Sequence, residues 1–146
     1  MKIRVTKVFE FEAAHALDCH DGKCSNIHGH SYKLHVTVIG DPARDKGMPK
    51  DGMVIDFSDI KNAVKIAVIN PFDHALILED DSPYLTETIR KRQKLILYSI
   101  QPTAENMLLD MVERVKDRLP KNTELHSMKL FETRSSWAEW FVTDNN

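Results

Sequence analysis

The chain is poor in the features that mark secreted and membrane proteins. It has only two cysteines among 146 residues. No apolar run approaches the roughly 20 residues that a membrane-spanning helix needs. Lys2 and Arg4 interrupt the apolar residues at the N-terminus, so no secretory signal peptide is predicted. We therefore expect a soluble cytoplasmic protein without a disulfide framework.

Strong charge and internal repeats are missing as well. The formal net charge is −2, which provides no basic field for nucleic acid, although local lysines could still bind an anionic small molecule. No repeat, low-complexity segment or Gly/Ser linker divides the chain. Hydrophobic residues make up 42% of it, enough for a core of its own. We expect residues 1–146 to form a single domain.

What the sequence does contain is a cysteine shortly before two histidines, in the segment 24–30. On an extended backbone His28 and His30 project from the same face, because strand side chains alternate. Further upstream, His15 ends an apolar run. Three neutral imidazoles that converge on one point would bind Zn²⁺ and leave a coordination position open, as in catalytic zinc sites. The thiol of Cys24 beside such a cation would be a reactive thiolate.

Other interpretations of these residues stay open at this point. Cys19, Cys24, His28 and His30 could form a closed zinc knuckle, which would make the chain a zinc-stapled binding module rather than an enzyme. A disulfide between the two cysteines would need an oxidising compartment, which nothing else in the sequence supports. Against the knuckle, such sites usually stabilise small modules, whereas this chain can build its own core.

Hydrophobic periodicity predicts an α+β fold. Alternation indicates strands, and apolar spacings of three and four residues indicate helices. The expected order is ββαβ-like and then αββ, with antiparallel hairpins and the helices on one sheet face. The strands are expected at 3–11 with extension to 15, at 32–38 with extension back to 28, and at 125–131 and 137–142; the helices begin near 57 and 104.

Capping residues and prolines set the expected helix ends. Asp56 or Ser58 is the predicted N-cap of the first helix, and Asn70-Pro71 is its predicted stop. The second helix should begin after Thr103, which caps it, and end at Pro120. Its predicted apolar face comprises Leu108, Met111, Val112, Val115 and Leu119.

An acid and a base stand side by side between the two helices. His74 could take a proton from Cys24 while Asp73 holds the histidine tautomer, which is how a base or nucleophile is activated. The simpler interpretation is an exposed loop. The segment 82–94, rich in basic residues, is interpreted as a solvated helix or loop, with a phosphate-facing role as the weaker alternative.

Two further carboxylates are candidates for a binding site. Glu105 stands in the first turn of the second helix, where an acid already complements the helix dipole. Glu132 follows Met128 and Leu130 on one strand parity, so it should be partly buried, and an unpaired buried carboxylate is costly. A ligand edge with two N–H donors, such as a pterin or guanine, would satisfy it. Arg134 could do so too.

Five motifs stand in this order along the chain: Phe11–His15, Cys24–His30, Asp73-His74, Pro102–Asn106 and Phe131–Thr133. Together they resemble the family of 6-pyruvoyltetrahydropterin and 6-carboxytetrahydropterin synthases. The resemblance covers about residues 7–141 and implies the tunnelling fold. In that fold a four-stranded antiparallel sheet carries two helices, trimers close a barrel, and two trimers form a homo-hexamer with active sites between subunits.

The resemblance also implies roles for the candidate residues, and it leaves Cys19 and His20 without one. Zinc would make the protons of the substrate's side-chain hydroxyls more acidic. The segment 79–101 is longer than in the shortest members of the family. The implied zinc ligands are His15, His28 and His30; the implied base is Cys24 with Asp73 and His74 as its proton relay; and the implied pterin pocket contains Glu132, Glu105 and Thr103.

The implied substrate is 7,8-dihydroneopterin triphosphate, and two products are known in the family. One branch eliminates triphosphate and yields 6-pyruvoyltetrahydropterin. The other also releases acetaldehyde and yields 6-carboxytetrahydropterin for queuosine and deazaguanine synthesis. The compact chain, the close spacing within 24–30 and the tail 132–140 resemble the carboxy branch. We expect a lyase without nucleic-acid or membrane partners.

Overall fold

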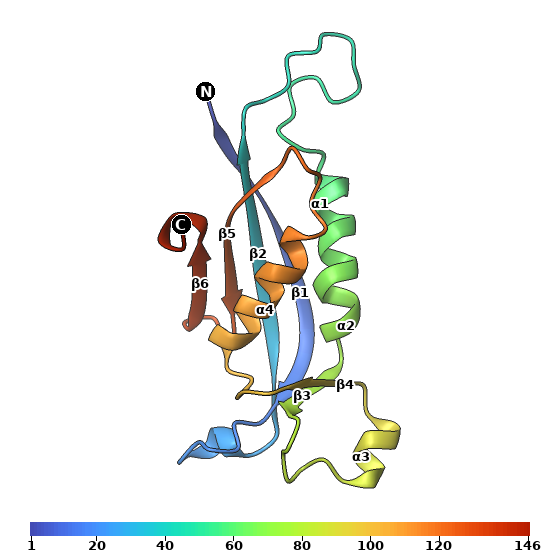
Figure 1. Cartoon of the computed structure of the whole chain (residues 1–146), viewed down its shortest axis with the longest axis vertical. Coiled ribbons are helices and arrows are strands. Elements are labelled where there is room, and N and C mark those ends of the chain that lie inside the picture. Colours follow the sequence, from blue (N-terminus) through green and yellow to red (C-terminus); the bar gives the residue numbers. More distant parts are fainter.

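The computed structural model describes all 146 residues as an α+β fold built on one six-stranded sheet (Figure 1). Its centre is a long antiparallel hairpin of β1 and β2, in which 13 residues of each strand pair. In spatial order the strands are β4 (Leu95–Tyr98), β3 (Ala75–Glu79), β1 (Ile3–His15), β2 (His28–Gly40), β5 (Glu124–Phe131) and β6 (Trp137–Phe141).

The expected α+β class is confirmed, but the expectation of a four-stranded antiparallel sheet is wrong. Strands β1, β2, β5 and β6 are antiparallel as expected, whereas β3 pairs in parallel with β1, and β4 pairs in parallel with β3. The apolar run 75–78 explains the addition, because all four of its residues are buried. Parallel strands are covered on both faces and therefore read as continuous apolar runs.

The two faces of β3 contact different hydrophobic clusters. Ile77 belongs to the main core of 25 buried residues. Leu76 and Leu78 form a smaller cluster with Ala16, and partly buried apolar residues of the segment 84–95 pack against it. The segment 82–94, predicted as a solvated helix or loop, therefore also covers one sheet face, and the additional strand β4 follows it.

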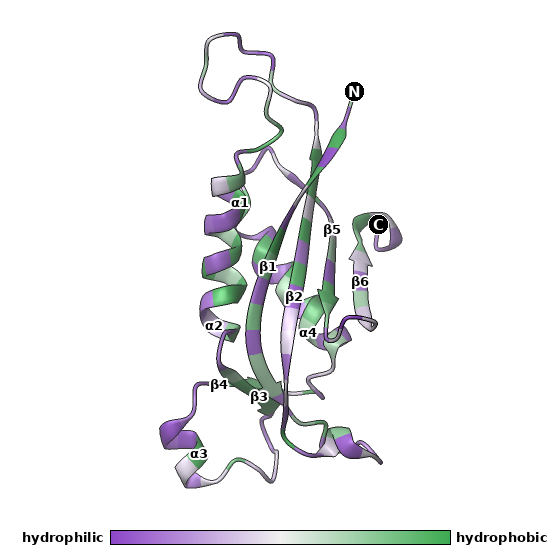
Figure 2. Ribbon diagram, turned by 180° about the vertical axis from the view of Figure 1, so that it is seen from behind, coloured by the Kyte–Doolittle hydropathy of each residue, from purple (hydrophilic) through white to green (hydrophobic).

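Two helical segments lie on one side of the central hairpin, as the opposite views in Figures 1 and 2 show. Both contribute buried residues to the main core. A third, short helix, α3 (Glu87–Arg92), lies beside β4. The two segments are α1 (Phe57–Val64), which continues through η2 (Lys65–Ile69) into α2 (Asn70–Phe72), and α4 (Ala104–Lys116).

The first helical segment passes through its predicted stop. Asp56 caps it as expected, since its side chain accepts a hydrogen bond of 2.7 Å from the Ser58 N–H. Pro71 lies inside α2, after a π-helical turn. In a regular α-helix the proline ring would clash with the carbonyl four residues before it, and the wider π turn relieves that clash. The helix ends at Phe72, immediately before the Asp73-His74 pair.

The second helical segment begins as predicted and ends earlier. The Thr103 side chain accepts a hydrogen bond of 3.2 Å from the Asn106 N–H and caps α4. The helix ends at Lys116, before Pro120 is reached. Four of the five predicted apolar positions are buried, and Leu119, beyond the helix, packs at the edge of the core.

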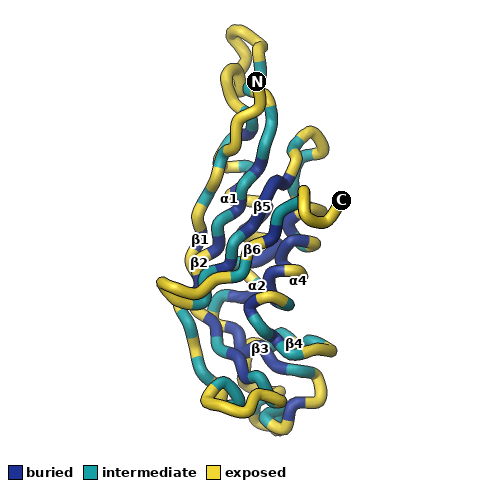
Figure 3. The backbone as a smooth tube through the Cα atoms, turned by 90° about the vertical axis from the view of Figure 1, so that its left-hand side faces the viewer, coloured by how far each residue is buried: buried dark blue, intermediate teal, exposed yellow.

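Alternation along β1 decides which of its residues enter the core. Phe9, Phe11 and His15 are buried, while Glu10 and Glu12 between them are exposed. Buried residues concentrate where the central strands pass the helices, and exposed residues concentrate in the terminal loops (Figure 3). No helix is long and apolar enough to cross a bilayer.

Candidate functional site

The register of the β1–β2 hairpin brings three histidines together at one end of the sheet. His15 is paired with His28, and His30 is paired with Ala13 two residues earlier on β1. The ring centroids are 4.6 Å apart for His15 and His28, 5.4 Å for His15 and His30, and 5.0 Å for His28 and His30. Glu132, just after β5, joins them. Ligand atoms of these four residues all lie within 4.8 Å of one another, and we call them the His/Glu cluster.

Backbone carbonyls determine the tautomers of two of these rings. His15 Nδ1 lies 2.8 Å from the Pro102 carbonyl oxygen, and His28 Nδ1 lies 2.7 Å from that of Asn26. A carbonyl can only accept, so both Nδ1 atoms carry hydrogen and both neutral rings present an Nε2 lone pair. The two Nε2 atoms face each other at 3.1 Å. Two facing lone pairs repel unless a proton or a cation lies between them.

This donor set is compatible with a bound metal ion. Ligand nitrogens on tetrahedral zinc lie roughly 3.3 Å apart, given its usual bond lengths, and the His15–His28 separation is 3.1 Å. His30 Nε2 is buried without an aligned hydrogen bond. Burial lowers the pKa of His30 and thereby favours the neutral imidazole, which is the form that binds metals. The residues present could hold a metal ion.

Glu132 contacts the histidines directly. Its Oε1 lies 2.8 Å from His30 Nε2 and 3.5 Å from His15 Nε2, and its side chain is 25% exposed. Contact with His15 and the nearby His30 lower the pKa of the carboxyl group. Arg134, the alternative partner, makes no ion pair with it. In this chain the carboxylate therefore lies in the cluster.

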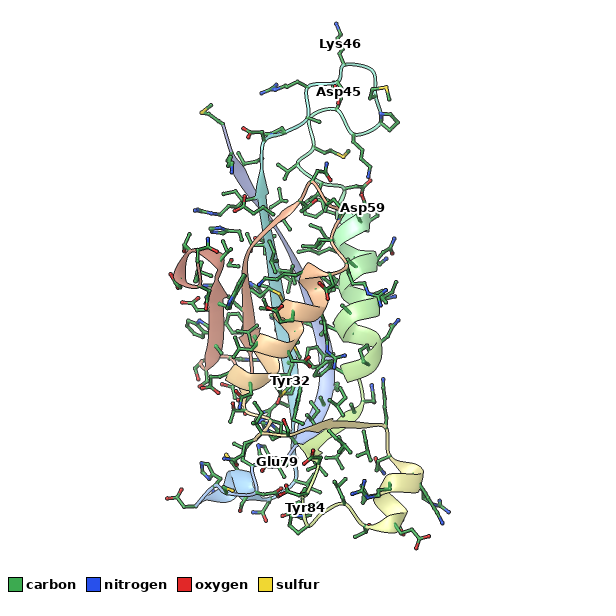
Figure 4. All side chains as sticks on the ribbon, in the orientation of Figure 1. Tyr32, Asp45, Lys46, Asp59, Glu79 and Tyr84 are labelled. Atoms are coloured by element: carbon green, nitrogen blue, oxygen red, sulfur yellow. The ribbon has the colours of Figure 1, made fainter.

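Tyr32 also lies in this region, although the sequence predicted no role for it beyond the start of a strand. Its ring lies 5.5 Å from that of His30 and is fully buried, and Figure 4 shows it in the interior of the molecule. The hydroxyl has no hydrogen-bond partner. Burial, with the charge of Glu132, raises the pKa of this phenol. The spacing His28, His30, Tyr32 was the available signal, since the three share one strand face.

Cys24 lies in η1 (Lys23–Ser25), within the loop between β1 and β2. It is half-buried, and its carbonyl oxygen accepts a hydrogen bond of 2.8 Å from the Leu17 N–H. Cys19 is exposed in the same loop, and both thiols are free. Neither cysteine belongs to the His/Glu cluster, so the zinc knuckle that the sequence left open is not assembled. His20 also lies outside it and accepts a hydrogen bond from Gly22.

Asp73 and His74 form the sharp connection between α2 and β3, which we call the corner. His74 has φ of +61°, a left-handed conformation that is uncommon for residues other than glycine. Its Nδ1 lies 3.0 Å from Asp73 Oδ1, which also accepts a hydrogen bond of 3.0 Å from the Glu12 N–H. That bond, more than the neighbouring histidine, lowers the pKa of Asp73. The ionised carboxylate thus orients the imidazole.

The corner borders a cavity of about 540 Å³. His74 lines it together with Glu12 and, across β2, His30 and Ser31. The Ser31 hydroxyl donates a hydrogen bond of 2.8 Å to Glu12. No hydrogen bond joins Cys24 to either residue of the corner. The structure therefore brings the predicted metal ligands together, but it does not assemble the predicted base with its relay inside one chain.

The predicted pterin-pocket residues of α4 lie at the start of that helix. Thr103 is half-buried and uses its hydroxyl oxygen as the helix cap. Glu105 is exposed in the first turn and contacts no other charged group. Pro102, one residue before the cap, accepts the hydrogen bond from His15. The start of α4 is thus joined to the His/Glu cluster.

Comparison with known proteins identifies relatives over nearly the full length. The family model described as 6-pyruvoyl tetrahydropterin synthase matches residues 4–141. A 6-carboxy-5,6,7,8-tetrahydropterin synthase from Haemophilus influenzae is 38% identical and covers 94% of this chain and 97% of its own length. One of the same name from Aquifex aeolicus is 31% identical and covers 96% and 98%.

Solved structures show the same fold. An uncharacterized protein from Wolinella succinogenes matches with a TM-score of 0.79 at 19% identity, covering 97% of this chain and 99% of that one. The 6-pyruvoyl tetrahydropterin synthase of Caenorhabditis elegans matches with a TM-score of 0.70 at 24% identity, covering 97% and 96%.

Proposed function

This chain belongs to the 6-pyruvoyl tetrahydropterin synthase family, and we propose that it is a zinc-dependent 6-carboxy-5,6,7,8-tetrahydropterin synthase. The reaction converts 7,8-dihydroneopterin triphosphate and water to 6-carboxytetrahydropterin, acetaldehyde and triphosphate. Relatives with 31–38% identity carry that name, which favours the carboxy branch. The free cysteines fit a reducing compartment such as the cytoplasm.

The observation that carries the proposal is the convergence of the His/Glu cluster. His15, His28 and His30 would hold the metal, because their lone pairs converge and two of the rings are fixed by carbonyl groups behind them. Three imidazoles leave one tetrahedral position for the substrate. Bound zinc would polarise the side-chain hydroxyls of the pterin and acidify their protons.

Cys24 is proposed as the base that moves protons on the substrate side chain, with Asp73 and His74 as its relay. Ionised Asp73 holds His74 Nδ1, which leaves Nε2 free to exchange a proton. Because these groups do not meet within one chain, the relay would reach Cys24 across a subunit interface. The unpaired edge strands β4 and β6, with half-exposed Trp137 on β6, favour such an assembly. We propose a homo-hexamer with sites between subunits.

Glu132 is proposed to anchor the amino-pyrimidine edge of the pterin, with Thr103 and Glu105 at the rim of the same pocket. Its two carboxylate oxygens match two N–H donors of that edge. The ring would then lie beside the histidines, since Glu132 Oε1 is 2.8 Å from His30. The histidines would engage the side chain through the metal while Glu132 engages the ring.

Product analysis tests the proposal. Purified protein with zinc should consume 7,8-dihydroneopterin triphosphate and release acetaldehyde and 6-carboxytetrahydropterin in equal amounts. Formation of 6-pyruvoyltetrahydropterin without acetaldehyde would move the chain to the pyruvoyl branch. Zinc-loaded protein that leaves the substrate unchanged would overturn both assignments.

A further inference from the structure

Lys94, the residue before β4, makes hydrogen bonds to both sides of the corner. Its ammonium group donates a hydrogen bond of 2.7 Å to the Asp73 carbonyl oxygen and another to that of Asn70. Its own carbonyl oxygen accepts a hydrogen bond of 2.8 Å from the Leu76 N–H. One side chain and one peptide group thus join the end of α2, the corner and the start of β3.

The end of α2 is a natural position for a cation. The last carbonyl groups of a helix have no partners within it and carry partial negative charge. The corner begins at that point, and only two residues connect the helix to β3. The Lys94 ammonium satisfies two carbonyls there, with charge-assisted bonds that are stronger than neutral ones.

The conformation of His74 explains why the corner needs external support. A left-handed backbone is unfavourable for a residue with a Cβ and persists only where the surroundings hold it. The His74 N–H donates to the Glu12 carbonyl at 2.6 Å on one side. Lys94 holds the other end of the same peptide group, the Asp73 carbonyl oxygen. Without it, the peptide between Asp73 and His74 could rotate and the imidazole would leave the carboxylate.

We propose that Lys94 is a positioning residue, which holds Asp73 and His74 in the geometry that proton relay requires. This inference rests on the proposed function. Lys94 touches neither the metal ligands nor the cavity. It acts through the two carbonyls and not on the substrate. The segment 79–101 then does more than pack against the sheet, because it contains β4 and the lysine that precedes this strand.

A nearby lysine provides a matched control. Lys91, on α3, is exposed and pairs with Glu87 at 2.5 Å on the same helix, so it has no bond to the corner. Lys91→Met removes the same charge and keeps a similar side-chain volume, three residues before Lys94 in the chain. Lys94→Arg keeps a cation that can still donate to carbonyl oxygens.

In the zinc-loaded full-length enzyme, Lys94→Met should lower kcat about tenfold or more and leave KM within twofold, because the relay is disturbed and substrate contacts are not. Lys94→Arg should recover a large part of kcat, and Lys91→Met should match the wild type. Unchanged kcat in Lys94→Met would overturn the inference. A uniform loss of folded protein, with normal kcat per folded enzyme, would overturn it too.

The histidine signals provide a readout that does not depend on turnover. Nitrogen-15 NMR of His74 should show the Nδ1–H tautomer in the wild type and in Lys91→Met, and a mixed tautomer population in Lys94→Met. The same tautomer in all three variants would overturn the positioning role. If the wild type converts no pterin, the proposed function fails, and the NMR comparison still decides what Lys94 does.

Discussion

The His/Glu cluster and the corner both present histidines, but they hold them by different means. His15 is 1% exposed, and its place follows from strand register and a hydrogen bond to the Pro102 carbonyl. The His74 side chain is 78% exposed, and its orientation depends on a strained left-handed backbone. A rigid cluster suits metal binding, which needs fixed distances. A corner held by a few exposed bonds can adjust when another subunit or a substrate arrives.

The largest expected effect is loss of metal from the cluster. His28→Ala should weaken Zn²⁺ binding by more than the roughly 10–100-fold that removal of an outer-shell partner costs, and turnover should be lost with it. His20→Ala is the control, since that ring lies outside the cluster. His74→Ala should retain the metal. Elemental analysis and zinc titration measure these differences.

The fold should survive the loss of zinc, because the main core contains none of the cluster residues. Chelation should therefore leave far-UV circular dichroism unchanged. Global unfolding on chelation would assign the metal a structural role. The core would then depend on the His/Glu cluster and would not be separate from it.

Cys24→Ala tests the proposed base. This thiol would act on a substrate held by the His/Glu cluster and exchange protons with the corner. Loss of general-base catalysis should lower kcat by about 10²–10⁴-fold, while zinc content and pterin affinity stay near those of the wild type. Cys19→Ala, in the same loop, should remain active. Loss of zinc from Cys24→Ala, with retention in His15→Ala, would instead support a cysteine-containing metal site.

Glu132→Gln tests whether the cluster also holds the pterin. Replacing a charged acceptor by an amide loses one charge-assisted bond, which should weaken pterin binding by roughly 1.5–3 kcal/mol, about ten- to hundredfold. Zinc content should persist, because three imidazoles remain. Calorimetric titration with a pterin and a zinc assay measure both. Zinc loss with normal pterin affinity would make Glu132 a metal ligand.

The smallest expected effect concerns backbone strain at the corner. His74→Gly should be about 1 kcal/mol more stable than His74→Ala, since glycine adopts positive φ without the Cβ clash. Both variants lack the imidazole and should lose relay activity equally. Urea denaturation compares their stabilities. Equal stability would mean that the corner is not strained, and its contrast with the cluster would disappear.

The two regions also differ in how far the sequence predicted them. The alternation in 28–38 predicted that His28 and His30 share one strand face, and the alternation in 3–15 predicted that His15 lies on the apolar face of its own strand; β1 and β2 show both faces. The caps at Asp56 and Thr103 were equally local and are confirmed. Local patterns suffice wherever a strand or helix period determines which way a side chain points.

The failures arose where distant segments decide the outcome. Asn70-Pro71 was predicted to end the first helical segment, but the helix continues through a π turn to Phe72. The run 75–78 did not reveal its pairing partner, because a continuous apolar run has no period. Its parallel pairing with β1 depends on what covers both faces.

The sequence by itself determined the α+β class, the alternating faces of β1 and β2, and a set of histidines suited to a metal, because these depend on short-range periodicity and side-chain chemistry. Only the tertiary structure decided that Glu132 joins the histidines, that the sheet has six strands, and that Lys94 lies against the corner. Those contacts join residues far apart in the chain. Register, packing and charge across the folded molecule select them, and no local pattern records that selection.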